Sequence, residues 1–326
     1  MSERRRSGVE IPLVRRFPAL ARIPRVALTN APTPVAPLAD ISPSLWIKRD
    51  DLSADPLGGN KVRSLEFLLA PVRPGDRIVT VGSAGSTHAL AVATYARLLG
   101  GRVLVGRWRQ TMNPTAALVA ARVAEAAERA PVFRSTVGAY VWATLQRMRG
   151  AHWVAAGGST PLGILGHVNA GLELVEQIDA GALPSPRYVV VPLGTGGTAA
   201  GLALAFAIAG KHIVVVGARV VPRIIGRHAR VMRLARATVR LIGRRTGEQL
   251  PAMRDDAVRV VHDAYGGSYG AETAAARAAA QRLEAATGIR ADASYSAKGL
   301  QVALDLAGRE TTLFWLTFDP RTLNES

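Results

Sequence analysis

Residues 188–210 read YVVVPLGTGGTAAGLALAFAIAG, and this stretch decides the class of fold. It carries no charge over 23 residues, which is long enough for a helix that spans a membrane. Pro192 and the glycines of GTGGT interrupt it, however, and such residues are typical of a turn between two elements. The pattern therefore predicts a buried strand over Tyr188–Leu193, a tight loop, and a buried helix that runs to about Ala209.

The same alternation of strand and helix extends over most of the chain. Continuous apolar runs indicate strands at Leu45–Lys48, Arg77–Val81, Arg102–Gly106, His152–Ala155, His212–Val216 and Thr312–Leu316. Helices are expected at Val62–Ala70, Ala89–Leu99, Thr115–Arg129, Ile164–Ile178, Arg227–Ile242, Ala271–Ala286 and Gly299–Leu306. Continuously apolar strands are typical of parallel sheets that helices cover on both faces. The sequence therefore predicts an α/β fold, in which ligands bind where strands end and helices begin.

Composition narrows the chemistry. With 326 residues, 48% of them hydrophobic, the chain can build a large core. It has no cysteine, which excludes disulfides and thiolate metal sites, and its six histidines are scattered, so we expect no metal. The first residues are basic but lack the apolar segment of a secretory signal. A cytoplasmic protein without a membrane span is therefore expected.

The formal net charge of +17 comes from arginine, because the chain contains only four lysines. Arginine-biased codon usage explains this most simply, and binding to nucleic acid or to a membrane surface is the alternative. Seven arginines recur every three or four residues between Arg223 and Arg244, which predicts a basic helix with a solvated face. An anionic partner for that face is the second interpretation, and nucleic acid is not expected.

The loop GTGGT, Gly194 to Thr198, has the pattern of a phosphate cup. Its glycines let backbone N–H groups turn toward an anion, and Thr195 and Thr198 offer hydroxyl donors. A turn without a ligand is the alternative. Neither a P-loop lysine nor the acidic residue of a dinucleotide site follows at the required distance. The loop is therefore predicted to hold one phosphate group and not a nicotinamide dinucleotide.

A second loop of small residues, GSAGSTHAL from Gly82 to Leu90, follows the strand RIVTV. Its backbone N–H groups and the hydroxyls of Ser86 and Thr87 would suit a carboxylate. Capping of the next helix by Ser86 or Thr87 is an alternative that can coexist with binding. His88, taken alone, is more often a packing residue than a catalyst.

The stretch LGGNKVRSLEFLL, residues 57–69, places Lys61 between glycines and an apolar helix. An amine in such a setting is desolvated, which lowers its pKa and makes it a nucleophile. A phosphate cup, a carboxylate cup and such a lysine together suggest pyridoxal phosphate, which binds a lysine as a Schiff base. Tyr269 and Tyr295, in the segments YGGSYG and ASYSAKGL, are further candidates for ligand contact, although Tyr295 could equally pack.

The motif LWIKRDDLSADPLGGNKVRSLEFLL resembles the signature of the 1-aminocyclopropane-1-carboxylate deaminase and D-cysteine desulfhydrase family. That family belongs to the tryptophan-synthase-β-like (fold type II) pyridoxal phosphate enzymes. The resemblance continues in order through GSAGSTHA, GGSTPLGILGHVNAGLEL, PLGTGGTAAGL, GGSYG and DASYSAKGL, and it covers nearly the whole chain. It implies two three-layer α/β/α domains with mostly parallel sheets and the cofactor in the cleft between them. Residues 1–71 and 164–326 would form the larger domain, residues 72–163 the smaller one, and two chains a homodimer.

Carried over position by position, the resemblance assigns roles to individual residues. Lys61 is the Schiff-base lysine and the proton carrier at Cα, assisted by Tyr295, while Ser86 holds the substrate carboxylate. Ser296 falls where the family places a partner for the pyridine nitrogen. The substrate-binding set is Ser86, Thr87, His88, Tyr269 and Tyr295. The remaining cofactor-binding positions are Asn60, Thr87, Gly194, Thr195, Gly196, Gly197, Thr198 and Thr317.

Several departures from the family pattern bear on the substrate. The family's asparagine is Thr87 here, and its preceding glutamine is Gly85. Residue 296 is serine, where the cyclopropane deaminases have glutamate and the desulfhydrases threonine, so ring opening is disfavoured. A family His-Thr-Gly-Gly becomes Leu-Thr-Phe-Asp at residues 316–319, and Phe318 and Asp319 would strain a backbone shape that only glycine adopts.

We therefore expect a lyase or deaminase that acts on a small amino acid. β-Elimination from a D-cysteine-like substrate, giving pyruvate, ammonia and sulfide, is the preferred reaction. The alternatives are a cyclopropane deaminase, another β-elimination or β-replacement on an unfamiliar amino acid, and a cofactor-binding homologue with impaired catalysis.

Overall fold

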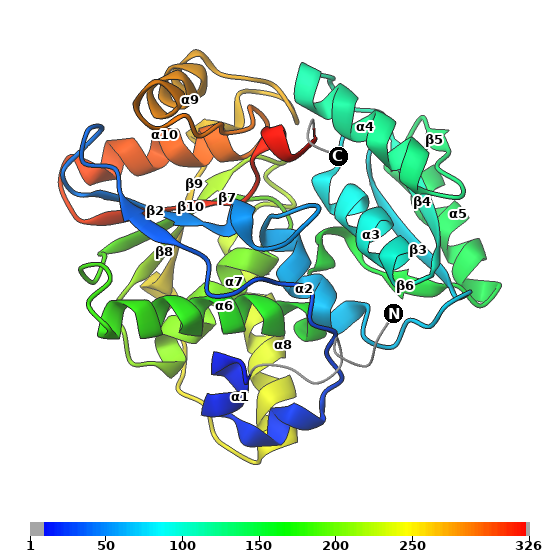
Figure 1. The fold of residues 1–326 in the computed structure, drawn as a ribbon, viewed down its shortest axis with the longest axis horizontal. Helices are drawn as coiled ribbons and strands as arrows, with labels where there is room; N and C mark the ends of the chain where they lie inside the picture. Colours follow the sequence, from blue (N-terminus) through cyan, green and yellow to red (C-terminus); the bar gives the residue numbers. More distant parts are fainter. Residues whose placement is uncertain (1–9, 324–326) are drawn as a thin grey trace.

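The computed structural model describes residues 10–323, so the basic segment 1–9 lies outside the described residues (Figure 1). It contains a six-stranded sheet of order β1-β2-β10-β7-β8-β9 and a four-stranded sheet of order β5-β4-β3-β6. Within the described chain, the named strands pair in parallel except for β1 with β2. The strands are β1 Val35–Pro37, β2 Leu45–Arg49, β3 Arg77–Ser83, β4 Arg102–Trp108, β5 Val132–Phe133, β6 His152–Val154, β7 Tyr188–Leu193, β8 Val214–Arg219, β9 Val258–Val261 and β10 Thr312–Leu316.

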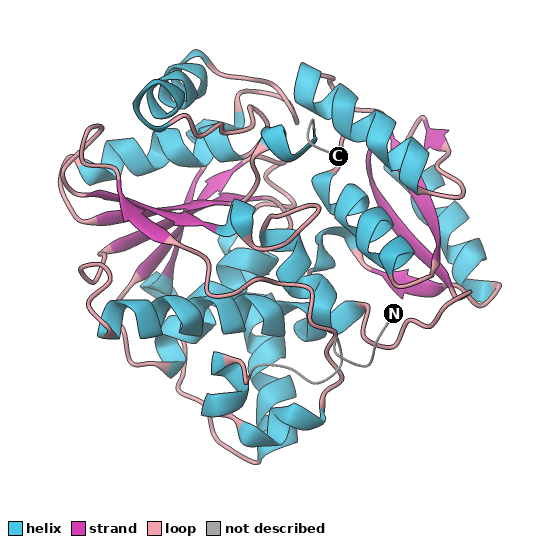
Figure 2. Cartoon of the chain, in the orientation of Figure 1, coloured by secondary structure: helices cyan, strands magenta, loops and turns pink. Residues whose placement is uncertain are grey.

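Helices cover both faces of each sheet, as Figure 2 shows. Helices α9 and α10 lie on one side of the larger sheet and α6, α7 and α8 on the other, while α3 and α4 face α5 across the smaller sheet. The helices are α1 Pro12–Arg16, α2 Asn60–Leu68, α3 Thr87–Leu98, α4 Pro114–Ala126, α5 Thr136–Met148, α6 Pro161–Asp179, α7 Gly197–Ile208, α8 His228–Thr246, α9 Ala274–Thr287 and α10 Ser296–Ala307. The predicted α/β fold with two α/β/α units and mostly parallel sheets is confirmed.

The predicted elements are present with ends that differ by a few residues. The uncharged stretch 188–210 forms β7, a loop and α7, and no helix within residues 10–323 is long and apolar enough to cross a membrane. Helices α1 and α5 and strands β1, β5 and β9 were not predicted. The domain boundaries at residues 71 and 163 stay a prediction, although β3 to β6 of the smaller sheet all fall between them.

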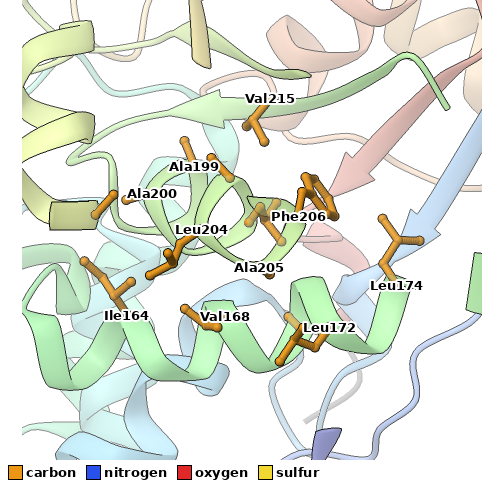
Figure 3. Packing of buried hydrophobic residues seen from close by; sticks show 14 of the residues in the cluster. Ile164, Val168, Leu172, Leu174, Ala199, Ala200, Leu204, Ala205, Phe206 and Val215 are labelled. Atoms are coloured by element: carbon orange, nitrogen blue, oxygen red, sulfur yellow. The ribbon is translucent and has the colours of Figure 1, made fainter. Parts of the chain in front are cut away.

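The largest core lies beneath the six-stranded sheet. It is built mainly from α6 and α7, and Figure 3 shows side chains of both helices with Val215 of β8 above them. Almost every side chain of α7 is buried, which explains why this helix carries no charge. The strand before it and the helix itself therefore hold the GTGGT loop on a rigid support.

Helix α2 packs against α6 and carries Lys61 in its first turn. The two helices approach closely at Gly166, where a Cβ atom would lie 1.9 Å from the carbonyl oxygen of Arg63. Glycine at this position of α6 is therefore required for the observed contact. The position of α2 in turn sets where the lysine amine lies.

Candidate active site

A cavity of about 710 Å³ lies where strands of both sheets end. Its wall includes residues that follow β3, β4, β7 and β8, which is where ligands bind in open α/β sheets. The structure brings most of the predicted site residues to this cavity. Those that line it are Lys61, Ser86, Thr87, His88, Gly194, Thr195, Tyr269 and Tyr295.

The other predicted residues lie behind the cavity wall. Asn60 Nδ2 donates a hydrogen bond of 2.8 Å to Thr198 Oγ1, which ties the start of α2 to the start of α7. Ser296 is fully buried at the start of α10, and its Oγ lies 3.4 Å from Thr317 Oγ1. These four residues, together with Gly196 and Gly197, therefore do not line the cavity.

Lys61 lies in the first turn of α2, and Gly59, the residue before that helix, fixes where the helix starts. Gly59 has φ +121°, and a Cβ atom there would lie 2.7 Å from the carbonyl oxygen of Thr317. Within residues 10–323 the Lys61 amine has no hydrogen-bond or ion-pair partner. Burial without a counterion lowers the pKa of Lys61 to about 8. A sizeable fraction of the amine is therefore neutral, and nucleophilic, near neutral pH.

A buried ionic network supports α2 at Arg63, two residues after Lys61. Arg63 binds Asp50 Oδ1 through Nε at 2.8 Å and Glu173 Oε2 through Nη1 at 2.7 Å. Lys48 Nζ binds the other oxygen of Glu173 at 2.6 Å. All four side chains are at most 3% exposed. Burial by itself raises the pKa of Glu173, but Arg63 and Lys48 outweigh it and lower that pKa to about 2.

The GTGGT loop has a backbone geometry that suits an anion, and its binding of a phosphate stays a prediction. Gly196 has φ +93° and precedes α7, whose amino end has no side-chain cap, so backbone N–H groups remain available there. Thr195 Oγ1 lies 2.6 Å from Ser159 Oγ, and Arg230 Nε donates to the Thr195 carbonyl at 3.1 Å. A loop with free N–H groups beside an unpartnered lysine fits the phosphate and the aldehyde of pyridoxal phosphate.

The GSAGST loop caps α3 and also reaches the cavity, and its binding of a carboxylate stays a prediction. Ser86 caps α3 by accepting a hydrogen bond from the N–H of Ala89 at 3.3 Å, and both Ser86 and Thr87 still line the cavity. Burial, together with the nearby Lys61, lowers the pKa of His88 to about 3. His88 is therefore neutral at physiological pH, so it cannot act as a general acid at that pH.

Two tyrosines from the segment between β9 and α10 line the cavity. The hydroxyls of Tyr269 and Tyr295 are hydrogen-bonded to each other, and Ser83 Oγ donates to Tyr269 at 3.3 Å. Burial raises the pKa of both phenols, and for Tyr295 the neighbouring Tyr269 adds to the effect. Both remain protonated near neutral pH. The buried Asp292 accepts the N–H of Tyr295 at 2.9 Å and so fixes its backbone.

The expected strain at the end of β10 is absent. No residue other than glycine within the described chain has a positive φ, so Phe318 and Asp319 adopt ordinary backbone shapes. Phe318 packs in the core that contains Val62 and Leu65 of α2. The chain here takes a backbone path that does not need glycine, so Phe318 and Asp319 replace the family's glycines without strain.

Several cavity residues were missed by the sequence interpretation. Trp108 and Arg109 stand at the end of β4, and the rule that ligands bind at strand ends could have identified them. Ser159 lies in GGSTPLG, a motif that was recognised only as part of the family pattern. Other missed residues include Ser83, Gln110, Thr111, Tyr140, Trp153, Ile225 and Arg230. The described residues contain no group of histidine and acidic side chains that could hold a metal ion.

Comparisons with known proteins identify the class. The family model for pyridoxal-phosphate dependent enzymes matches residues 26–317, so the chain belongs to that family. Nocardicin C-9' epimerase of Nocardia uniformis subsp. tsuyamanensis is 33% identical, over 94% of this chain and 96% of its own. A putative 1-aminocyclopropane-1-carboxylate deaminase of Pyrococcus furiosus is 31% identical over 88% of each chain.

Further matches narrow the group. D-cysteine desulfhydrase of Serratia proteamaculans is 29% identical over 88% of this chain and 89% of its own. The crystal structure of an ACC deaminase homologue superposes with a TM-score of 0.78 at 26% identity, covering 93% of this chain and 94% of that one. The protein is thus a pyridoxal phosphate-dependent enzyme of the 1-aminocyclopropane-1-carboxylate deaminase and D-cysteine desulfhydrase group, with homologues that support lyase or deaminase chemistry.

Proposed function

We propose that the protein catalyses β-elimination from a D-cysteine-like amino acid. The Cα–H and Cβ–S bonds break, one water molecule is consumed, and D-cysteine yields sulfide, ammonia and pyruvate. The observation that carries the proposal is the Lys61 amine, which lies at the cavity, has no hydrogen-bond or ion-pair partner among residues 10–323 and has its pKa lowered to about 8. Such an amine can take up and return a proton near neutral pH.

Each remaining role follows from the position of a group around Lys61. The N–H groups and hydroxyl at Ser86 would hold the substrate carboxylate, and the GTGGT loop would hold the cofactor phosphate. Bound pyridoxal phosphate supplies the electron sink for charge that develops at Cα. Lys61 Nζ would remove the Cα proton, and the protonated hydroxyl of Tyr295 would assist the departing sulfur. Ser296 does not line the cavity, so the resemblance alone makes it the partner of the pyridine nitrogen; a neutral partner there favours elimination over transamination.

Pyruvate release from D-cysteine, followed by a coupled assay, tests this proposal. We expect turnover by the wild-type enzyme and a loss of about a thousandfold or more in Lys61→Ala, because the proton carrier and cofactor anchor are both removed. Lys211→Ala is the matched control, since Lys211 forms an exposed ion pair with Asp179 away from the cavity. Equal activity in Lys61→Ala and wild type would refute the assigned role.

Epimerisation at Cα is a second candidate. It is favoured by the 33% identity to nocardicin C-9' epimerase over 94% of the chain. Inversion needs one group to remove the Cα proton and another to return it from the opposite face, and Lys61 with Tyr295 offers two such groups. Incorporation of deuterium from D₂O with formation of the other enantiomer, and without pyruvate, would establish epimerisation in place of elimination.

A homodimer remains our proposal for the oligomeric state. It is supported by an apolar stripe on α5, where Val137, Val141, Leu145 and Met148 recur at helical spacing and are 47–80% exposed. Light scattering coupled to gel filtration would give twice the mass of 34.4 kDa for a dimer. The cytoplasmic location and the absence of a nucleic-acid partner stay predictions.

A further inference from the structure

Part of the cavity wall has no role in the reaction proposed above. Lys61, the GSAGST loop and the GTGGT loop account for the proton carrier, the carboxylate and the phosphate. The remaining wall is formed mainly by Trp108, Arg109, Tyr140, Trp153, Ile225 and Arg230. These residues come from β4 and the position after it, from α5 and β6, from the segment that leads into α8 and from α8 itself, so they approach the cavity from both sheets.

Three of them form a continuous aromatic surface. The rings of Trp108 and Tyr140 are stacked, with centroids 6.3 Å apart and an angle of 19° between the planes. The rings of Tyr140 and Trp153 are 6.2 Å apart and tilted by 56°. None of the three is fully buried, and Tyr140 is 43% exposed. An aromatic surface that stays accessible inside a cavity is suited to a planar apolar group, because stacked rings attract each other in addition to the effect of burial.

The same wall carries positive charge without acidic partners. Within residues 10–323 the Arg109 side chain makes no hydrogen bond or ion pair, and Arg230 binds only the Thr195 carbonyl. Burial raises the pKa of Tyr140, and the charge of Arg230 opposes that effect, so Arg230 lies near the aromatic surface. None of the described residues that line the cavity is acidic. Two arginines therefore face the cavity with capacity for an anion.

We propose that the β-substituent of the substrate carries an aromatic or similarly planar group. This group ends in a carboxylate. The planar group packs against Trp108, Tyr140 and Trp153, and the carboxylate pairs with Arg109 and Arg230. This inference rests on the proposed function, because it treats the cavity as the site of an amino acid bound next to Lys61. A sulfide-releasing enzyme for free D-cysteine alone would leave this wall without a ligand.

Three probes separate the parts of the proposal: D-cysteine, S-benzyl-D-cysteine and S-(4-carboxybenzyl)-D-cysteine. Each is titrated into the pyridoxal phosphate-loaded enzyme, and the half-saturating concentration is read from the change in cofactor absorbance. We expect S-benzyl-D-cysteine to bind about tenfold tighter than D-cysteine, and the carboxybenzyl compound about tenfold tighter again. Each tenfold step corresponds to about 1.4 kcal/mol of binding free energy. This readout reports binding whether the bound compound eliminates, epimerises or does not react.

Variants then assign the effect to residues. Arg109→Gln and Arg230→Gln should each lower the ratio of carboxybenzyl to benzyl affinity several-fold, while Trp153→Ala should weaken both aromatic probes relative to D-cysteine. Arg240→Gln is the matched control, because Arg240 is an exposed arginine on the same helix as Arg230 and does not line the cavity. Melting temperatures of all variants show whether each chain is folded.

Several outcomes would overturn the inference while leaving the proposed function intact. One is similar binding of all three probes with normal turnover of D-cysteine. Another is an unchanged affinity ratio in Arg109→Gln and Arg230→Gln, with the cofactor lost more readily from Arg230→Gln, which would mean that Arg230 serves the cofactor phosphate. A wild-type chain that binds no pyridoxal phosphate would overturn the proposed function, and this inference with it.

Discussion

Two lysines show how differently the molecule treats the same side chain. Lys48 is fully buried, and its ammonium group donates to Glu173 Oε1 at 2.6 Å, to the Thr33 carbonyl at 2.7 Å and to Gln177 Oε1 at 2.6 Å. All three of its hydrogens are therefore used. Lys61, at the wall of the cavity, has none of these partners within the described chain. Burial lowers the pKa of both amines, but only Lys48 has a carboxylate that opposes the effect.

The comparison separates a structural cation from a reactive one. The network around Lys48 and Arg63 joins β2, α2 and α6, so it fixes the helix that carries Lys61. The charged residues that fix α2, such as Arg63 and Lys48, have hydrogen-bond and ion-pair partners. Lys61, which α2 places at the cavity, has no such partner among the described residues. A buried unpartnered amine costs free energy, and an active site retains it because reactivity depends on it.

The largest effect on stability is expected from Arg63→Met, which removes one cation of the network. Asp50 and Glu173 then lose their bonds to the guanidinium while they stay buried. We expect the free energy of unfolding to fall by about 3–5 kcal/mol, because breaking a buried ion pair leaves charge without compensation. Urea denaturation of wild type and variant measures the difference. A loss below about 1 kcal/mol would contradict the structural role given to the network.

Gly59→Ala should come next, since it alters the residue that starts α2. The φ of +121° is unfavourable for alanine, and the new Cβ would lie 2.7 Å from the Thr317 carbonyl oxygen. We expect a loss of about 2–3 kcal/mol, together with weaker binding of pyridoxal phosphate because Lys61 moves.

Gly75→Ala is the matched control for that substitution. Gly75 also has a positive φ, +87°, but nothing lies within 4 Å of the position of a Cβ atom. Its substitution should cost about 1 kcal/mol from backbone strain alone and should leave cofactor binding unchanged. Equal effects of the two substitutions would mean that the contact with Thr317 does not matter.

The sequence predicts the parts of the site whose requirements are local. Lys61 and the two loops could be recognised because each motif spans only five to ten residues. Glycines and hydroxyl side chains at a strand end indicate a ligand-binding loop. The network could not be predicted, because Arg63 and Glu173 are 110 positions apart and nothing in either segment indicates the pairing. The same holds for the hydrogen bond between Asn60 and Thr198.

Helix α5 was missed for a different reason, and the aromatic surface was missed with it. Its segment TVGAYVWATLQRM contains β-branched and aromatic residues, which have low helix propensity and favour a strand interpretation. Tertiary packing against β3 and β4 overrides that preference. Ser135, whose side chain accepts a hydrogen bond from the N–H of Gly138, is the one local signal of the helix start.

The lowered pKa of Lys61 predicts how the rate of cofactor capture depends on pH. Only the neutral amine attacks the aldehyde, so the rate should rise about tenfold per pH unit below pH 8 and level off above it. Absorbance after mixing apoprotein with pyridoxal phosphate between pH 6 and 10 measures the rate. Lys61→Ala is the control and should show no saturable capture. A rate that still rises steeply above pH 9 would mean that the pKa is not lowered.

The same pKa also fixes the sign of a stability effect. The folded-state pKa of about 8 lies below the ordinary value of 10.5, so between these values the unfolded chain binds more protons. The contribution of Lys61 to stability is therefore unfavourable below pH 8 and becomes less so as pH rises toward 10.5. Wild type should thus gain stability relative to Lys61→Met across this window in parallel urea denaturations.

The smallest effect is expected from Arg15→Met, which makes the same chemical change as Arg63→Met on the surface. Arg15 Nη2 contacts both oxygens of Glu176, at 2.7 and 2.6 Å, in the same kind of charged pair as Arg63 with Glu173. The two side chains are 44% and 49% exposed, however, so water and salt already solvate the charges. We expect a loss below about 1 kcal/mol in urea denaturation, reduced further at 1 M salt. Because Arg63 also binds Asp50, the difference between the two substitutions measures the effect of burial together with that of the second carboxylate. If both cost the same, burial is not what separates the network under Lys61 from an ordinary surface ion pair.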